Sequence, residues 1–568
     1  MADNLLKQPN INYLWSSLLV EELRRQGADH FFVAPGSRSA PIASAIGHNK
    51  KVRVFVHFDE RALAFMACGY AASSGKPAVL ICTSGTAAAN FLPGIIEASK
   101  KKLPLIILTA DRPPELQKTG AAQTIEQSGL YQAYVRWSFD MPCPSRDIPP
   151  QFVLTTAGHL ISRARGELSG PVHLNMMFRE PLSPAISNRG LSRYTALLTN
   201  WACSNNVYTH YYPKVSILTA DTLSDISTRF GRIKNGIILA GKLSTSRDQK
   251  AVLTLAERLQ FPVFADITSG LRLGNDHPNV ITYYDQVLLN KKVLSSVDGV
   301  IHFGGRMTSK RCYDQLALCD LKEYVMALGH PLRSDPLHQV TARLTVTPAL
   351  FIDSILPLIP QRSSSGLLLM LKRENSRWSN QLRKDDSRND LSEPIIARRV
   401  SRLIPAGDGL FLSNSMPVRD MDMYASADGH PVVVGANRGA SGIDGIIASA
   451  AGFAEGLGRT TTLMIGDLAF LYDLNALALL RSLDQRLIIV VMNNNGGGIF
   501  THLPVAADHL IFDRFFKTPH GLSFAAAAAL FKIRYAAPLS ARSFELIYRQ
   551  ALKARRSSII EIKVSPRK

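Results

Sequence analysis

Apolar runs of strand length recur along the whole chain, and nearly all of them end in Gly, Ser, Asn, Asp or Arg. Examples are "HFFVAPGS", "KPAVLICTSG", "LPLIILTADRP", "NGIILAGK", "FPVFADI", "DGVIHFGGR", "GLFLSNS", "PVVVGANRG", "TTTLMIGD" and "RLIIVVMNNN". Stretches with helical spacing separate these runs. Continuous apolar strands with helices between them are typical of parallel sheets that helices cover on both faces. Ligands of such sheets bind beyond the carboxyl ends of the strands, so we expect the site among these polar strand ends.

Two polar segments, around 183–215 and around 360–394, interrupt the alternation of strands and helices. A chain of 568 residues is long enough for about three domains. We therefore predict an α/β fold of three doubly wound parallel-sheet domains, at 1–188, 189–362 and 363–568. The alanine run "FAAAAALF" (524–531) is expected to form a buried helix.

Composition excludes several classes of protein. Hydrophobic residues make up 46% of the chain and charged residues 19%, which indicates a globular protein and not a disordered one. The net charge of +20 comes from scattered Lys and Arg, whereas a nucleic-acid-binding protein would gather them on one face or tail. Six dispersed cysteines without a CxxC pair favour a reducing compartment. We find no signal-peptide pattern and no apolar run of membrane-spanning length, so a cytoplasmic location is expected.

Two strand ends carry oxygen ligands that suit a metal ion. The run "TTTLMIGD" ends at Asp467, and "VVMNNNGGGIF" contains Asn494 one helical crossover later. Carboxylate and amide oxygens are hard ligands that suit Mg²⁺, and a backbone carbonyl near Gly496 would add a third. Mg²⁺ held by so few protein groups usually bridges to the phosphates of a ligand. The alternative is an aspartate helix cap and an Asn-Gly turn without any ligand.

Two further segments suggest a flat, ring-containing cofactor. In "VHFDERALAFMACGYA" (56–71), Glu60 begins an Ala- and Gly-rich helix. The helix dipole alone would favour a carboxylate there, but a carboxyl group in an apolar niche can also share a proton with a ring nitrogen. The glycine-rich loop "GANRGASGIDG" (435–445) permits close approach of the backbone to a ligand. Its Ile443 would then stand between the two rings of the cofactor.

Basic side chains follow several of the same strands. They are Arg38, Arg112, Arg306, Arg311, Arg419 and Arg438, with Lys310 beside Arg311. A single surface arginine is usually without special function, but guanidinium groups grip carboxylates through two parallel hydrogen bonds. The pattern indicates substrates with several carboxylates. It disfavours acetolactate-type enzymes, whose substrates carry one carboxylate each.

Together these stretches resemble the 2-succinyl-5-enolpyruvyl-6-hydroxy-3-cyclohexene-1-carboxylate synthase family, thiamine diphosphate enzymes of menaquinone biosynthesis. The matching stretches are "APGSRS", "HFDERA", "TSGTAAAN", "LTADRPPEL", "NRGASGIDG", "GDLAFLYDLNALALL" and "NNNGGGIF". The Gly-Asp pair, followed by two asparagines about 25 residues later, is similar to the diphosphate–metal signature of thiamine diphosphate enzymes at large. One position departs from the family pattern, with Ala436 in place of Ser. The central third matches only around "SKR".

The resemblance implies a fold of the thiamine diphosphate enzyme type, with the cofactors thiamine diphosphate and Mg²⁺ (or Mn²⁺). Its domains would be an aminopyrimidine-binding domain (1–188), a central α/β domain (189–362) and a diphosphate- and Mg-binding domain (363–568). Glu60, Arg419 and Arg438 would be catalytic, with Glu60 as the proton partner of the aminopyrimidine. Residues implied to bind the cofactor are Glu60, Ser415, Ile443, Asp467, Asn494 and Gly496, of which the last three hold the metal. Residues implied to bind substrate are Ser37, Arg38, Arg112, Gln123, Lys310, Arg311, Arg419, Arg438, Ile499 and Phe500.

The implied reaction is a transferase reaction with two halves. 2-Oxoglutarate is decarboxylated, and the resulting succinyl carbanion equivalent adds to isochorismate in a 1,4-addition. The resemblance also implies a homodimer or homotetramer with the active site at the chain interface. No nucleic acid and no membrane span are expected. Two alternatives stay open: another thiamine diphosphate-dependent 2-oxo acid decarboxylase or carboligase, and a cofactor-binding protein without activity.

Overall fold

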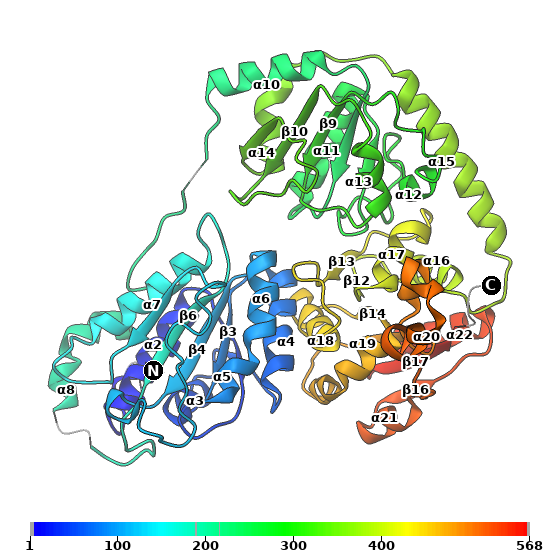
Figure 1. Cartoon of the computed structure of the whole chain (residues 1–568). Coiled ribbons are helices and arrows are strands. Elements are labelled where there is room, and N and C mark those ends of the chain that lie inside the picture. Colours follow the sequence, from blue (N-terminus) through cyan, green and yellow to red (C-terminus); the bar gives the residue numbers. More distant parts are fainter. Residues whose placement is uncertain (1–4, 188–189, 215, 565–568) are drawn as a thin grey trace. The chain divides into compact units, whose positions relative to one another are not determined.

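The computed structural model describes residues 5–187, 190–214 and 216–564. Within these residues the strands form three parallel sheets of six, five and six strands, with helices between most successive strands (Figure 1). The expected α/β fold is therefore confirmed. The described chain divides into two compact units. The first unit extends through the first sheet to Pro213 and includes Asn437–Gly458 and Phe470–Leu487; the second includes Lys214–Ala436, Arg459–Ala469 and the residues from Ile488 on.

The first sheet belongs to the first unit and has the strand order β2-β1-β3-β4-β6-β5. Its strands are β1 (His30–Val33), β2 (Arg53–Val56), β3 (Ala78–Cys82), β4 (Leu105–Asp111), β5 (Ser138–Met141) and β6 (Val172–Met177). The accompanying helices include α2 (Ile11–Arg25), α3 (Ala40–His48), α4 (Glu60–Ser74), α5 (Thr86–Asn90), α6 (Leu92–Lys101) and α7 (Gln151–Ala164). The strand order reverses between β1 and β3, and such a switch point is where ligands bind in doubly wound sheets.

The second sheet has the order β11-β10-β9-β7-β8. Its strands are β7 (Gly236–Ala240), β8 (Val263–Ala265), β9 (Gly299–Phe303), β10 (Glu323–Leu328) and β11 (Ala342–Thr345). The helices around it include α10 (Ala220–Arg232), α11 (Ser246–Leu259), α12 (Tyr284–Val287), α13 (Lys310–Leu316), α14 (Pro348–Ile355) and α15 (Gly366–Asp385). Along β7, Ile238 and Ala240 join one apolar core, whereas Ile237 and Leu239 join the other. Both faces of this sheet are therefore buried, which explains its continuously apolar strands.

The third sheet has the order β13-β12-β14-β15-β17-β16. Its strands are β12 (Gly409–Leu412), β13 (Val433–Ala436), β14 (Thr461–Gly466), β15 (Leu487–Asn493), β16 (Arg534–Ala536) and β17 (Ser558–Lys563). The helices of this part of the chain include α16 (Glu393–Leu403), α17 (Met416–Tyr424), α18 (Ile446–Leu457), α19 (Asp467–Tyr472), α20 (His509–Phe512), α21 (Ala525–Leu530) and α22 (Ala541–Lys553). The order reverses between β12 and β14, so a second switch point follows these two strands.

Each apolar run quoted from the sequence contains a strand, but two other expectations need correction. The alanine run forms α21 as expected, yet most of its residues are exposed and only Ala528 of the helix is buried. The segment around 360–394, which its charge marks as a linker, contains the 20-residue helix α15. Leu367 and Leu371 of α15 pack into a core of the second sheet. Helical spacing of a few leucines outweighed the polar composition here.

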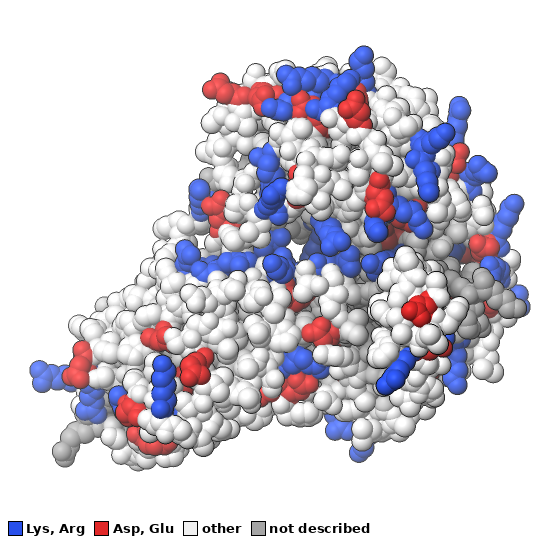
Figure 2. Space-filling view, viewed as in Figure 1, with Lys and Arg blue, Asp and Glu red and all other residues white. Residues whose placement is uncertain are grey.

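Basic side chains are distributed over many elements of the visible face and mixed with acidic ones (Figure 2). In the described part of the chain, no helix combines the length and the apolar character that crossing a membrane requires.

Candidate active site

A cavity of about 540 Å³ lies at the switch point of the first sheet. It is lined by Glu60, by the loop after β3 (residues 83–85) and by Asn90 and Gln123, among others. Asp59, the residue before Glu60, caps α4, since its side chain accepts a hydrogen bond from the Ala62 backbone N–H at 3.1 Å. The capping role is therefore filled by Asp59, and the Glu60 carboxylate borders the cavity, where it accepts a hydrogen bond from Asn90 Nδ2 at 3.4 Å.

The wall of this cavity is more polar than the apolar niche that the sequence predicts for Glu60, because hydroxyl and amide side chains line much of it. A buried glutamine supports the wall from behind. The Gly85 backbone N–H donates to Oε1 of Gln127 at 2.9 Å, and Nε2 of Gln127 donates to Oδ1 of Asn175 at 2.9 Å. Gln127 and Asn175 are almost fully buried. The loop after β3 is thus held by a polar chain that begins on β6.

The predicted substrate residues of the first unit surround the same switch point. Ser37 is exposed in the loop after β1, and the next residue, Arg38, is buried. Nη1 of Arg38 donates to the Phe178 carbonyl at 3.1 Å and lies 3.2 Å from a Glu180 carboxylate oxygen. Arg112 follows β4 and donates through Nε and Nη2 to the Ala122 carbonyl, at 3.2 and 2.8 Å. This contact holds the turn before Gln123, whose φ of 55° lies in the left-handed region.

Asp467 lies at the switch point of the third sheet, directly after β14, and is 2% exposed. Its Oδ2 accepts a hydrogen bond from the Gly496 backbone N–H at 2.8 Å and lies 3.1 Å from Nε2 of His520. Its Oδ1 accepts from the Leu468 N–H at 2.8 Å. The strand end after β15 is therefore tied directly to the strand end after β14, as the sequence pattern predicts.

The three asparagines at the end of β15 have three different partners. Asn493 donates through Nδ2 to the Leu522 carbonyl and to a carboxylate oxygen of Glu561, at 3.0 and 2.8 Å. Oδ1 of Asn495 accepts from the backbone N–H groups of His520 and Gly521, at 3.0 and 2.7 Å. Asn493 and Asn495 thus fasten the returning chain after residue 517. Asn494 donates through Nδ2 to a carboxylate oxygen of Glu393 at 3.2 Å.

The donor set at this second switch point fits a divalent metal ion. Oδ1 of Asn494 is buried and has no hydrogen-bond partner among the described residues. A buried amide oxygen without a partner is unfavourable unless a ligand completes it. At Gly496 φ is 127°, and an added Cβ would lie 2.1 Å from the Lys517 carbonyl oxygen, so only glycine fits this turn. Asp467 and Asn494 therefore offer oxygen atoms of the kind that Mg²⁺ prefers, while the Gly496 carbonyl accepts a hydrogen bond from the Gly498 N–H at 2.9 Å.

Other predicted residues of the second unit lie at the ends of strands β9 and β12. Ser415 has a φ of 70° and is the N-cap residue of α17, and Arg419 on the same helix donates through Nη1 to the Ser415 carbonyl. Burial and the neighbouring Arg306 guanidinium both lower the pKa of Arg419. Lys310 is exposed at the start of α13, whereas the guanidinium of Arg311 forms an ion pair with the buried Asp285 carboxylate.

Arg438 and Ile443 lie in the loop between β13 and α18 and do not line the cavity beside Glu60. Glu97 of α6 holds this loop: its buried carboxylate accepts hydrogen bonds from the backbone N–H groups of Gly439 and Ala440, at 2.9 and 2.6 Å. Ile443 is 37% exposed. Ile499 and Phe500 belong to a short 3₁₀ segment, Gly498–His502. The Phe500 ring packs edge-on against the ring of Phe516, with 5.8 Å between the ring centroids.

Three residues of these sites are missing from the sequence prediction: Glu97, Glu393 and His520. Glu393 accepts a hydrogen bond from Asn494 Nδ2 at 3.2 Å. None of the three follows an apolar strand, and each contacts residues far away in the sequence. The strand-end pattern that located Asp467 and Asn494 carries no signal for them.

Known proteins share the fold and the sequence family of this chain. Residues 15–130 match the family model described as "Thiamine pyrophosphate enzyme, N-terminal TPP binding domain", and residues 192–412 match "Middle domain of thiamine pyrophosphate". An X-ray structure from Mycobacterium smegmatis, described as a thiamin diphosphate-dependent enzyme, has the same fold, with a TM-score of 0.71 and 18% identity over 97% of this chain and 99% of that one.

Several relatives that are more similar to this chain in sequence carry the same name. Proteins named 2-succinyl-5-enolpyruvyl-6-hydroxy-3-cyclohexene-1-carboxylate synthase from Rubrobacter xylanophilus and Prosthecochloris aestuarii are both 42% identical over 98% of this chain, and the matches cover 96% and 95% of the relatives. The protein of the same name from Chlorobium phaeobacteroides is 41% identical over 98% of this chain. The chain therefore belongs to the 2-succinyl-5-enolpyruvyl-6-hydroxy-3-cyclohexene-1-carboxylate synthase family of thiamine pyrophosphate enzymes.

Proposed function

We propose that the protein catalyses the thiamine diphosphate-dependent decarboxylation of 2-oxoglutarate and the 1,4-addition of the succinyl unit to isochorismate. The product is 2-succinyl-5-enolpyruvyl-6-hydroxy-3-cyclohexene-1-carboxylate, an intermediate of menaquinone biosynthesis. The observation that carries the proposal is 42% identity over nearly the full length of relatives that bear the name of this synthase. The placement of Glu60 at one switch point and of Asp467 at the other also supports the proposal.

We propose that each cofactor is held between two chains, by the first switch point of one chain and the second switch point of the other. Glu60, at the edge of the first cavity, would hold a proton against a ring nitrogen of the aminopyrimidine. Asp467, Asn494 and the Gly496 carbonyl would hold Mg²⁺ or Mn²⁺ on the diphosphate, and Ser415 and Ile443 would line the cofactor. When bound, thiamine diphosphate supplies the electron sink for decarboxylation.

The basic residues support dicarboxylate substrates. The Arg306 guanidinium lies close enough for its charge to lower the pKa of Arg419. Two like charges near each other favour the binding of an anion beside them. The proposed substrate-binding residues are Ser37, Arg38, Arg112, Gln123, Lys310, Arg311, Arg419, Arg438, Ile499 and Phe500, of which Arg419 and Arg438 would also act in catalysis.

We assign the domains as the sequence predicts: aminopyrimidine-binding (1–188), central (189–362) and diphosphate-binding (363–568). Each of these ranges contains one of the three sheets. The family resemblance supports a homodimer or homotetramer in which two chains complete each active site. Six free cysteines suit a reducing compartment, so we place the enzyme in the cytoplasm.

The experiment that tests this function compares two donors. The purified full chain is incubated with thiamine diphosphate, Mg²⁺ and isochorismate, together with either 2-oxoglutarate or pyruvate, and mass spectrometry identifies the products. We expect the succinyl adduct from 2-oxoglutarate and at most a trace of adduct from pyruvate. A buried guanidinium that loses its carboxylate partner costs on the order of 2 kcal/mol, or roughly 30-fold in rate. Equal use of pyruvate would favour the general carboligase alternative.

A further inference from the structure

Glu393 contacts the side-chain amide of Asn494, the proposed metal ligand. It is the first residue of α16, its side chain is buried, and its Oε1 accepts a hydrogen bond from Nδ2 of Asn494 at 3.2 Å. The two residues are 101 positions apart in the sequence. The neighbouring contacts join Asp467 to the Gly496 backbone N–H and to the His520 ring.

The chemistry of a carboxylate decides how the Asn494 amide is turned. A carboxylate accepts hydrogen bonds and donates none, whereas an amide has a donor end and an acceptor end. Only Nδ2 of Asn494 can therefore face Glu393. The acceptor Oδ1 is turned the other way, and it is the buried oxygen for which the described residues provide no partner.

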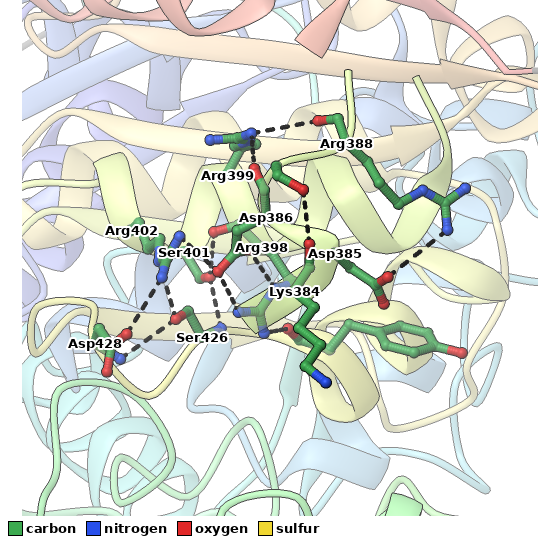
Figure 3. A network of polar contacts seen from close by, with 12 residues as sticks. Lys384, Asp385, Asp386, Arg388, Arg398, Arg399, Ser401, Arg402, Ser426 and Asp428 are labelled. Carbon is green, nitrogen blue, oxygen red and sulfur yellow. Dashed lines mark hydrogen bonds and ion pairs between the residues drawn. The ribbon is translucent and has the colours of Figure 1, made fainter. Parts of the chain in front are cut away.

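Helix α16 is itself held by ion pairs. Figure 3 shows Arg398 and Arg402 of this helix meeting Asp386, with Arg402 also reaching Asp428. The Arg398–Asp386 contact uses two hydrogen bonds, at 2.7 and 2.8 Å, and Arg398 is almost fully buried. On its other side the helix buries Ile396 and Val400 in the core of the third sheet. Glu393 is thus presented by a fixed element.

We propose that Glu393 is a positioning residue that orients the Asn494 amide so that Oδ1 faces the metal ion. This inference rests on the metal site proposed above and adds to it the residue that sets the direction of one ligand. Partners of this kind, which touch a metal ligand and not the metal, typically contribute 10- to 100-fold to metal affinity.

The first test measures binding and not turnover. Thiamine diphosphate is titrated into the full-length protein by calorimetry over a series of MgCl₂ concentrations. In Glu393→Gln the new amide can donate or accept, so Asn494 is no longer held in one orientation. We expect the Mg²⁺ concentration needed for half-maximal cofactor affinity to rise about 10-fold or more. The matched control is Glu545→Gln, which removes another carboxylate that pairs with α16, through Arg399, without touching Asn494; it should behave like the wild type.

A second background separates orientation from a general structural effect. In Asn494→Asp both side-chain oxygens are acceptors, so no orientation remains to be set, and the new carboxylate faces that of Glu393 at hydrogen-bond distance, where the two repel. Adding Glu393→Gln to this variant should therefore lower the Mg²⁺ requirement, the reverse of its effect in the wild type. If Glu393→Gln raises the Mg²⁺ requirement both in the wild type and in Asn494→Asp, Glu393 only stabilises the fold and the inference is overturned.

The same titrations distinguish this inference from the metal site on which it rests. If cofactor binding by the wild type is independent of Mg²⁺, or if Asn494→Ala binds Mg²⁺ and cofactor like the wild type, the proposed metal site itself is wrong. If Asn494→Ala loses the Mg²⁺ dependence while Glu393→Gln keeps that of the wild type, the metal site stands and the positioning role of Glu393 is wrong.

Discussion

Two adjacent carboxylates, Asp59 and Glu60, show how position decides the task of a single residue. Asp59 caps α4 through the Ala62 N–H, while Glu60 borders the cavity of the first sheet. A carboxylate at the start of a helix can either cap the helix or face a cavity, and in this structure Asp59 is the cap. The Glu60 carboxylate, which accepts a hydrogen bond from Asn90, is therefore not needed for capping.

Replacing Glu60 by Gln keeps the shape of the side chain but removes the carboxylate that would share a proton with the aminopyrimidine. We expect turnover to fall roughly 10²- to 10⁴-fold, the usual range for loss of acid–base assistance. Calorimetry should show cofactor binding that changes far less than turnover. Asp59→Asn is the matched control, because asparagine caps helices as well as aspartate does, and it should retain wild-type turnover. A Glu60→Gln enzyme with more than about half of the wild-type rate would refute the role.

At the scale of elements, single buried carboxylates fasten loops to helices. Glu97 of α6 holds the loop before α18 through the N–H groups of Gly439 and Ala440, and Asp473 accepts a hydrogen bond from the Ala448 N–H in the first turn of α18 at 3.0 Å. Helices α4 and α18 also pack extensively against each other. The loop that carries Arg438 and Ile443 is thus fixed from both of its sides by residues of the first unit.

Glu97→Gln should loosen this loop, because the amide replaces one of the two acceptor oxygens by a donor. Hydrogen bonds to a charged group contribute about 1.5–3 kcal/mol, so amide hydrogen exchange in the peptide 435–445 should accelerate roughly 10- to 100-fold. Hydrogen-exchange mass spectrometry measures this directly. The control is Glu115→Gln, which breaks a surface pair with Arg179 in which both side chains are about half exposed. Such pairs contribute little, so exchange in the peptide 435–445 should stay unchanged in Glu115→Gln. If exchange is also unchanged in Glu97→Gln, Glu97 does not hold the loop.

At the scale of the whole molecule, the charge of +20 at pH 7 makes acid a general stress, since every added proton increases self-repulsion. Two buried histidines add a specific effect, one in each unit. Burial lowers the pKa of His173 to about 4 and that of His302 to about 4. His302 is held between the Tyr324 hydroxyl at 2.9 Å and the Gly305 carbonyl at 2.7 Å. Both rings are neutral in the folded protein near pH 7.

The sign of their effect on stability follows from linkage. Unfolded histidine takes up a proton near pH 6.5, whereas the folded rings do so only near pH 4, so the free energy of unfolding falls as the pH drops through this window. Each ring accounts for a loss on the order of 3 kcal/mol. In His302→Gln, denaturant unfolding of the second unit should depend less on pH between 6.5 and 4 by about this amount. The control is His210→Gln, because His210 is exposed. If the unfolding free energy of His302→Gln depends on pH as steeply as that of the wild type, His302 does not cause the acid destabilisation.

Most of the architecture could be predicted from the sequence, because the signals that specify it are local. Apolar runs of strand length, helical spacing between them and polar residues at strand ends are all readable within a few neighbouring positions, and the structure confirms the α/β fold. The pairing of Asp467 with the turn after β15 was also predictable, since parallel strands bring their carboxyl ends to one edge. The roles of the site residues stay predictions.

Tertiary structure alone decided the partners of these residues. Glu393 meets Asn494 across 101 positions, Glu97 reaches the loop at Gly439, and Arg311 is already paired with Asp285. It also left α21 on the surface, although five consecutive alanines suggest burial. Periodicity reports which face of an element is apolar, but not what packs against it. Which donor meets which acceptor depends on how distant elements pack, because a buried polar group must find a partner wherever the fold places it.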